Sequence, residues 1–313
     1  MAVIQQNITK SGLDEIFDSA YEMDKQPSEV RADDSLFFRQ GETQWLTHQY
    51  SEFMGPGKFN KVVVDEEVPE ATIREGNKVS AEVFEYDLDV PIPERYQEAA
   101  EAYDLVQRSV YELGVNAMTS RDQWAFEQSY GDAFGGVDTP DGIDLVSNSH
   151  VSLNGDTIDN LETGALSADN LFTVIKSLRL QKAQNGRLAS YHADGVLVPV
   201  NLAMTAHEVA KSQLKAGTGN NNDNYFSTIY PGLQIGVSEW LDSTYNTLNS
   251  NANTSYFAVS RRHSICRKVR VPLTREYVSP EISRKRTAYY RARFSERVVA
   301  GSWGGVVGSN GTV

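Results

Sequence analysis

Residues 192–212 read HADGVLVPVNLAMTAHEVAKS, and two different periodicities meet within this stretch. The apolar run at 195–200 is typical of a buried strand, and it stops at a proline, which has no N–H to donate to a neighbouring strand. An alanine-rich helix follows, for which Asn201 is the predicted N-cap and Ala206 and Ala210 mark the buried face. No nucleophile, base or metal ligand stands at the junction, so the pattern favours a packing role over a catalytic turn.

The flanking sequence places this unit in a mixed α/β region. Upstream, Ser167 is the expected N-cap of a helix that is closed by Asn185-Gly186. The predicted buried face of that helix consists of Leu171, Val174, Ile175 and Leu178. Downstream, strands are expected at 233–237, 256–259 and 289–294.

The N-terminal part of the chain is organised differently. Leu13, Ile16, Phe17 and Tyr21 recur at helical spacing in an otherwise polar arm. Between residues 84 and 90, apolar and acidic residues alternate, which is typical of a strand with one covered face. With 62–64 as the second arm and 75–78 as a turn, the sequence predicts a long acidic hairpin. Such a hairpin is marginally stable alone and needs a surface to lie on.

A long amphipathic helix is predicted next, beginning at Pro93, because proline is favoured in the first turn of a helix. The predicted apolar stripe consists of Ala99, Tyr103, Val106, Val110, Leu113, Ala117 and Trp124. A helix of roughly 35 residues would extend about 50 Å, and the glycines at 131, 135 and 136 are expected to end it. We expect the stripe to pack on returning strands near Val269, Val271 and Phe294.

The net charge of −13 is unevenly distributed along the chain. Residues 261–297 hold twelve Lys or Arg against three Glu, a net charge of +9, which leaves −22 for the remainder. Residues 65–94 hold ten acidic against two basic residues, a net charge of −8. Opposite charges of similar size predict a contact between these two segments.

Cysteine content and hydropathy limit the setting in which the protein works. The one cysteine, Cys266, excludes internal disulfides. No apolar stretch approaches the roughly 18 to 20 residues that span a bilayer, and the N-terminus lacks the pattern of a secretory signal. We therefore expect the protein to work in the compartment where it is made.

Several stretches resemble catalytic or ligand-binding motifs, but each is incomplete. His207 lacks the second histidine of a zinc-protease helix, because Lys211 occupies that position. Ser238 lacks the second glycine of a nucleophile elbow, because Trp240 occupies it. The segment 217–219 lacks the third glycine of a dinucleotide-binding loop, and no P-loop is present. Turn formation explains the remaining cluster, Asp138, Asp141, Asp144 and His150, whose spacing is not that of an EF-hand. We therefore expect no enzyme activity and no metal or cofactor.

Taken in order, the polar arm, acidic hairpin, long helix, α/β region and returning basic strands resemble the major capsid proteins of tailed bacteriophages with the Hong Kong 97-type fold. Two motifs carry the closest similarity, which is to the Mu-like branch: TPDGIDLVSNSH at 139–150 and VLVPVNLAM at 196–204. The implied fold class is α+β, with an N-arm, an extended hairpin loop, a long spine helix in a peripheral domain, and a mixed α/β axial domain. The implied boundaries are 1–35 for the N-arm, 36–92 for the extended loop and its connections, 93–136 for the spine helix, 137–255 for the axial domain, and 256–313 for the return to the peripheral strands and the C-terminal tail.

The resemblance also implies a function. It implies a structural virion protein that self-assembles into hexamers and pentamers of an icosahedral shell around packaged double-stranded DNA, without sequence-specific binding. The implied partners are further copies of the chain, a separate scaffolding protein, a portal and decoration proteins, with no membrane and no cofactor. The implied location is the virion capsid, assembled in the host cytoplasm.

For the charged segments, the resemblance suggests that the acidic hairpin lies across a neighbouring subunit. The residues expected in this contact are Glu85, Asp87 and Asp89 on the hairpin and Arg284, Arg291 and Arg293 on the neighbour. An alternative directs the arginines inward at the packaged genome. Two other functions remain open: an encapsulin-like protein compartment, and a nucleic-acid-binding protein that uses residues 261–297. The charge of −22 elsewhere and the lack of an evident aromatic platform weigh against the second.

Overall fold

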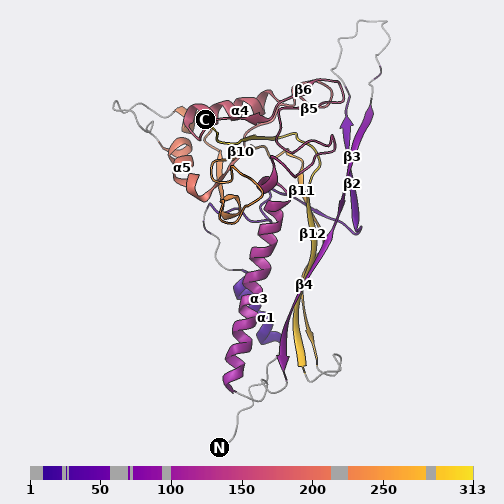
Figure 1. Cartoon of the computed structure of the whole chain (residues 1–313), viewed down its shortest axis with the longest axis vertical. Helices are drawn as coiled ribbons and strands as arrows, with labels where there is room; N and C mark the ends of the chain where they lie inside the picture. Colours follow the sequence, from indigo (N-terminus) through magenta and orange to yellow (C-terminus); the bar gives the residue numbers. More distant parts are fainter. Residues whose placement is uncertain are drawn as a thin grey trace, which may run out of the picture.

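The computed structural model describes residues 10–22, 26, 28–56, 70, 73–93, 100–212, 225–279 and 287–312. A long helix runs beside a narrow sheet, an α/β unit lies at one end of both, and a two-stranded hairpin projects beside that unit (Figure 1). The α-helices are α1 (Lys10–Tyr21), α3 (Ala100–Glu127), α4 (Ala168–Leu180), α5 (Ala203–Lys211) and α6 (Tyr225–Ile229). The strands are β1 (Arg39–Glu42), β2 (Thr47–Met54), β3 (Arg74–Glu82), β4 (Phe84–Pro93), β5 (His150–Val151), β6 (Thr157–Ile158), β7 (Leu161–Glu162), β8 (Gly195–Pro199), β9 (Gln234–Ser238), β10 (Tyr256–Val259), β11 (Ile265–Val278), β12 (Thr287–Ala300) and β13 (Val306–Ser309).

The four-stranded peripheral sheet has the order β1-β11-β12-β4, with the long antiparallel pair β11 and β12 at its centre. Helices α1 and α3 cover one face, because alternate residues of β12 are apolar and point toward them. The buried residues of this core are Leu13, Phe17, Ile92, Val106, Val110, Leu113, Ala117, Ala288, Tyr290 and Ala292. Most of the predicted spine stripe that the structure describes therefore lies in one core.

Two local features fix α3, the spine helix, in place. At Gly114, a Cβ would lie 2.7 Å from the Phe17 carbonyl oxygen and 2.8 Å from the Ala20 Cβ, so the glycine allows α1 to approach closely. Near the end of the helix, the Trp124 ring stacks on Tyr86 with the ring centroids 3.8 Å apart. The Trp124 ring also lies 6.0 Å from the Phe294 ring. The predicted docking of the spine helix on the strand that contains Phe294 is confirmed.

The five-stranded axial sheet has the order β7-β13-β10-β8-β9 and is covered on both faces. In β10, Tyr256 and Ala258 pack with the residues of α4 and α5, whereas Phe257 and Val259 point to a second core on the other face. All five residues of β8 are buried. The apolar run is continuous over 195–199 because this strand has no solvent-facing side. Val200, predicted as the end of the buried strand, lies in the following 3-10 turn and is 51% exposed.

Several elements of the axial region agree with the sequence. Ser167 caps α4, its hydroxyl accepting a hydrogen bond from the backbone N–H of Asn170. The buried side chains of α4 are the four predicted ones, Leu171, Val174, Ile175 and Leu178. The Asn201 cap was wrong: a short 3-10 turn over 200–202 precedes α5, and the Asn201 amide donates to the carbonyl oxygen of Asn253 instead.

The predicted acidic hairpin was also wrong. The segment 75–78 is not a turn but lies inside β3, which pairs with β2. The segment 84–90 belongs to β4 and pairs with β12 in the peripheral sheet. Val62 to Val64, the other predicted arm, lie outside the described residues. The extended hairpin is therefore formed by β2 and β3.

Two boundaries also differ from the prediction. Pro93 ends β4 rather than starting the spine helix, and this is compatible with its chemistry because β4 is an edge strand. β10, predicted among the peripheral strands, and β13, which lies in the predicted C-terminal tail, pair with each other in the axial sheet. The chain thus returns to the axial sheet twice, before and after the long pair β11 and β12.

Candidate assembly surfaces

The extended hairpin projects from the molecule and lacks a third strand. In the described part of the chain, β2 and β3 form a two-stranded sheet, paired only with each other (Figure 1). Apolar side chains on and beside it are exposed: Trp45 is 72% exposed, Phe53 59% and Ile73 63%. A two-stranded sheet of this kind is marginally stable in water. Its exposed apolar side chains indicate a surface that a further molecule covers.

The outer face of the peripheral sheet, opposite α1 and α3, carries the opposite charges that the sequence singled out. The Arg291 guanidinium forms two hydrogen bonds with Asp89, Nε to Oδ1 at 2.7 Å and the second nitrogen to Oδ2 at 2.9 Å. These bonds and the charge of Asp89 raise the pKa of Arg291. Arg270 forms a 2.6 Å ion pair with Glu85. Part of the charge complementarity of the two segments is therefore satisfied within one chain, where β4, β12 and β11 belong to one sheet.

The other residues predicted for the contact, Asp87, Arg293 and Arg284, form no ion pair that the structure describes. Arg293 lies directly opposite Asp87 on the paired strands, and both side chains are exposed. No ion pair joins either of them to another residue in the described part of the chain. Arg284 lies outside the described residues. Contact of any of these residues with a neighbouring subunit stays a prediction.

A groove of about 1020 Å³ lies between the root of the extended hairpin and the edge of β11. Trp45 and His48 line one side, and Arg270 and Leu273 line the other. Arg121 and Arg267 also line it, but both form ion pairs with Glu296. The groove is open and mixed in character, so it does not resemble an enclosed site for a small molecule.

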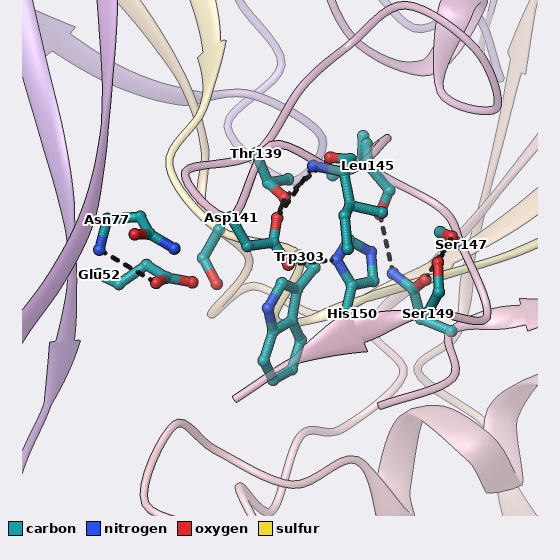
Figure 2. A network of polar contacts seen from close by, with 12 residues as sticks. Glu52, Asn77, Thr139, Asp141, Leu145, Ser147, Ser149, His150 and Trp303 are labelled. Carbon is teal, nitrogen blue, oxygen red and sulfur yellow. Dashed lines mark hydrogen bonds and ion pairs between the residues drawn. The ribbon is translucent and has the colours of Figure 1, made fainter. Parts of the chain in front are cut away.

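A buried polar network lies where the extended hairpin meets the axial domain (Figure 2). The His150 ring is fully buried, and its Nδ1 lies 2.8 Å from Asp141 Oδ2. Although burial alone raises it, hydrogen bonds from His150 and Thr139 hold the pKa of the Asp141 carboxyl below its usual value. Asp141 and His150, part of the predicted turn cluster, are thus brought together by the structure.

The sequence did not point to Glu52, which belongs to the same region. Glu52 is only 3% exposed, although it lies in the exposed strand β2. Its carboxylate accepts hydrogen bonds from the backbone N–H of Asn77 at 3.3 Å and from Gln184 Nε2 at 3.0 Å. The sequence offered one indication that Glu52 is buried. Alternation along a strand places its side chain on the same face as those of Tyr50 and Met54.

The incomplete catalytic motifs do not form sites in the structure. His207 lies on α5, and one turn later Lys211 Nζ donates to the carbonyl oxygen of Leu233. The Ser238 hydroxyl caps a short 3-10 turn by accepting from the Trp240 N–H. The segment 217–219 lies outside the described residues. Among the residues that the structure describes, no group of three or more His, Cys, Asp or Glu is placed to hold a metal ion.

The described helices include none that is both long and apolar enough to cross a bilayer. In comparisons with known proteins, no family model and no curated protein matches the sequence.

Solved structures match the chain over nearly its whole length. The capsid of Myoviridae phage XM1 is 14% identical with a TM-score of 0.53, covering 92% of this chain and 94% of that one. The virus-like particle from Pyrococcus furiosus is 10% identical with a TM-score of 0.53, covering 96% and 98%. The capsid of the empty GTA particle is 11% identical with a TM-score of 0.52, covering 95% and 97%.

At identities this low, the similarity to the Mu-like branch stays a prediction. The agreement in architecture extends from the N-arm to the last strand. The spine helix, the projecting hairpin, the peripheral sheet and the axial sheet occur together in one chain. The chain therefore has the Hong Kong 97-type fold.

Proposed function

We propose that this chain is the major structural subunit of a phage-type capsid, in which copies of it assemble into hexamers and pentamers of an icosahedral shell around double-stranded DNA. The observation that carries the proposal is the extended hairpin, which exposes apolar side chains and has no partner strand in the described part of its own chain. A second copy of the chain supplies a covering surface in a self-assembling shell. The similarity to two phage-type capsids and a virus-like particle supports the same conclusion.

The hairpin can be tested by excision, because its root is closed. The backbone N–H of Val83 donates to the carbonyl oxygen of Leu46 at 2.7 Å, so residues 47–82 can be replaced by a short glycine-containing turn without stretching the chain. We expect a folded subunit, with the circular dichroism of the remaining sheets and helices, that forms no shells in electron micrographs. Normal shells from the excised chain would remove the hairpin from the assembly mechanism.

Electron microscopy of the purified full-length protein tests the proposal as a whole. We expect closed particles with icosahedral symmetry; a protein that stays monomeric under all conditions that support folding would contradict it.

The second candidate function is an encapsulin-like compartment, favoured by the similarity to the Pyrococcus furiosus virus-like particle. Particles produced during infection should hold DNA, detected as a 260 nm absorbance excess that nuclease does not remove. Co-purification of a specific cargo protein with DNA-free particles would favour the compartment.

The remaining partners belong to the same proposal. A separate scaffolding protein, a portal and decoration proteins would act on shells assembled in the host cytoplasm. Asp87 and Arg293 are the charged residues of the outer face that we propose for contacts with a neighbouring subunit, together with the Arg284 segment. The ion pair of Asp89 with Arg291 joins β4 to β12, and the ion pair of Glu85 with Arg270 joins β4 to β11, so both shape the surface that the neighbour would meet.

A further inference from the structure

The extended hairpin carries a β-bulge at the point where it touches the axial domain. In β2, Ser51 pairs with Lys78 and Phe53 pairs with Glu75, so that Glu52 faces two residues of β3, Gly76 and Asn77. A bulge bends a hairpin locally and redirects a side chain. The extra residue lies on β3, so Glu52 keeps the regular alternation of β2, and its carboxylate points out of the hairpin toward the axial domain and is almost completely buried there (Figure 2).

Glu52 ties the bulge to two loops of the axial domain through one glutamine. Gln184 donates from Nε2 to Glu52 at 3.0 Å and accepts at Oε1 from the backbone N–H of Leu153 at 2.9 Å. At Gly76, an added Cβ would overlap the Leu153 side chain and would lie 2.9 Å from Glu52 Oε2. We call Glu52, Gly76, Asn77, Leu153 and Gln184 the hairpin joint. It fixes the direction in which the hairpin projects.

The charges around the joint leave Glu52 without a cation. No lysine or arginine pairs with it in the described part of the chain, and the nearby titratable groups are Asp141 and His150, which bind each other. On β3, Lys78 and Glu75 form an exposed ion pair at 3.1 Å. Beside Gln184, Lys182 pairs with Asp156 at 3.1 Å. The basic groups near the joint are therefore committed to other carboxylates.

We propose that the hairpin joint is a proton-linked latch, which holds the hairpin in the present orientation while Glu52 is protonated and releases it to change its angle to the axial domain when Glu52 is ionised. A protonated carboxyl keeps the hydrogen bond from Gln184 without burying a negative charge beside Asp141. An ionised one is buried with two hydrogen bonds and, among the described residues, no lysine or arginine partner, which is costly.

The direction of the pH dependence follows from the position of Glu52. Burial raises the pKa of the Glu52 carboxyl and the charge of Asp141 raises it further, although hydrogen bonds from Asn77 and Gln184 and the charge of His150 act in the opposite direction. In the released hairpin the carboxyl is in water and has its ordinary pKa. The stability that Glu52 gives to the docked hairpin is therefore fully present below the ordinary pKa and is lost as the pH rises through the raised pKa.

Hydrogen–deuterium exchange of the full-length chain, read by mass spectrometry on peptides covering β2 and β3, tests the latch. At each pH, the unsubstituted chain is compared with Glu52→Gln, which imitates the protonated form, so that the chemical effect of pH on exchange cancels. At pH 4, below the ordinary pKa of a glutamate carboxyl, we expect nearly equal protection of the hairpin. At pH 8 we expect the unsubstituted hairpin to exchange faster than the Glu52→Gln hairpin, by up to about tenfold for each unit by which docking raises the pKa.

Two further variants make the experiment decisive. Glu82→Gln removes an exposed carboxylate from the same hairpin and should exchange like the unsubstituted chain at both pH values. Gln184→Ala cuts the tie and should expose the hairpin at both pH values, while peptides of α4 stay protected. Equal exchange of Glu52→Gln and the unsubstituted chain at pH 8 overturns the latch, as does a Glu82→Gln chain that behaves like Glu52→Gln. Because exchange is measured within one subunit, this outcome is independent of whether the chain builds shells.

Discussion

The bidentate pair between Asp89 and Arg291 allows a direct test of whether the charged strands meet within one chain or between neighbours. The two side chains are about one-third exposed, and Arg291 also lies opposite Glu276 on β11. A bidentate pair at this exposure contributes about 1 kcal/mol. Arg291→Asp removes it and places a carboxylate beside Asp89 and Glu276, and each repulsion adds a cost of similar size. We therefore expect a loss of about 2 to 3 kcal/mol in the free energy of unfolding of the subunit.

Exchanging the two charges should restore the stability of the subunit if Asp89 and Arg291 pair within one chain. A chain that carries both Asp89→Arg and Arg291→Asp should regain at least half of the lost stability in urea denaturation, and high salt should reduce the difference between the variants. Exchanging the exposed pair of Asp104 and Arg108 on α3 is the control, and we expect a change below about 0.5 kcal/mol. If mixing the two single variants restores shell formation and the double variant regains no stability of the isolated subunit, the pair acts between subunits and the intrachain interpretation is refuted.

Three further predictions concern the packing of the spine helix. Trp124→Ala should lower the free energy of unfolding by about 2 to 4 kcal/mol, because the half-buried ring is stacked between α3 and the sheet. The control, Trp45→Ala at an exposed position, should change the free energy of unfolding by less than about 0.5 kcal/mol. Equal effects of the two substitutions in thermal denaturation would contradict this packing. Gly114→Ala should lower the free energy of unfolding by about 1 to 2 kcal/mol despite the better helix propensity of alanine, because the added methyl group would overlap the Phe17 carbonyl oxygen. A variant that is more stable in the same denaturation experiment would show that α1 moves away from α3. Burial raises the pKa of Asp122 to about 6 while its carboxylate accepts from the Ala32 N–H at 2.8 Å, so the stability that it contributes is fully present below its ordinary pKa of 3.8 and is lost as the pH rises to about 6. Asp122→Asn, which keeps the acceptor, should remove this dependence in urea denaturation between pH 4 and 7, and an unchanged pH profile would assign it to another group.

Local sequence determined some elements almost completely. The four buried residues of α4 and its serine cap lie within one segment of a dozen residues, so their periodicity and capping could be identified without any knowledge of the remainder. The same holds for β8, whose continuous apolar run indicates burial on both faces. In both cases the side chains that define the element are close in sequence.

Long-range pairing could not be identified in this way. The alternation at 84–90 correctly indicates a strand, but alternation does not name the partner, and the partner of β4 is β12, about 200 residues further on. Two of the acidic residues assigned to a contact between subunits, Glu85 and Asp89, pair with Arg270 and Arg291 within one chain, whereas contact with a neighbouring subunit stays a prediction. The hairpin joint was missed for a related reason: Glu52 and Gln184 meet only once the fold has formed.

The position of β13 has a consequence for the synthesis of this protein. β13 lies between β7 and β10, and its residues, 306–309, are translated more than 100 residues after those of β8. Until then the nascent chain presents an unfilled slot with two open strand edges, which can pair with any extended chain nearby. On a polysome that produces many copies at once, adjacent nascent chains compete for this slot. We expect chains with a stop codon shortly before residue 306 to aggregate, and cellular folding factors to bind the nascent chain most strongly in that interval.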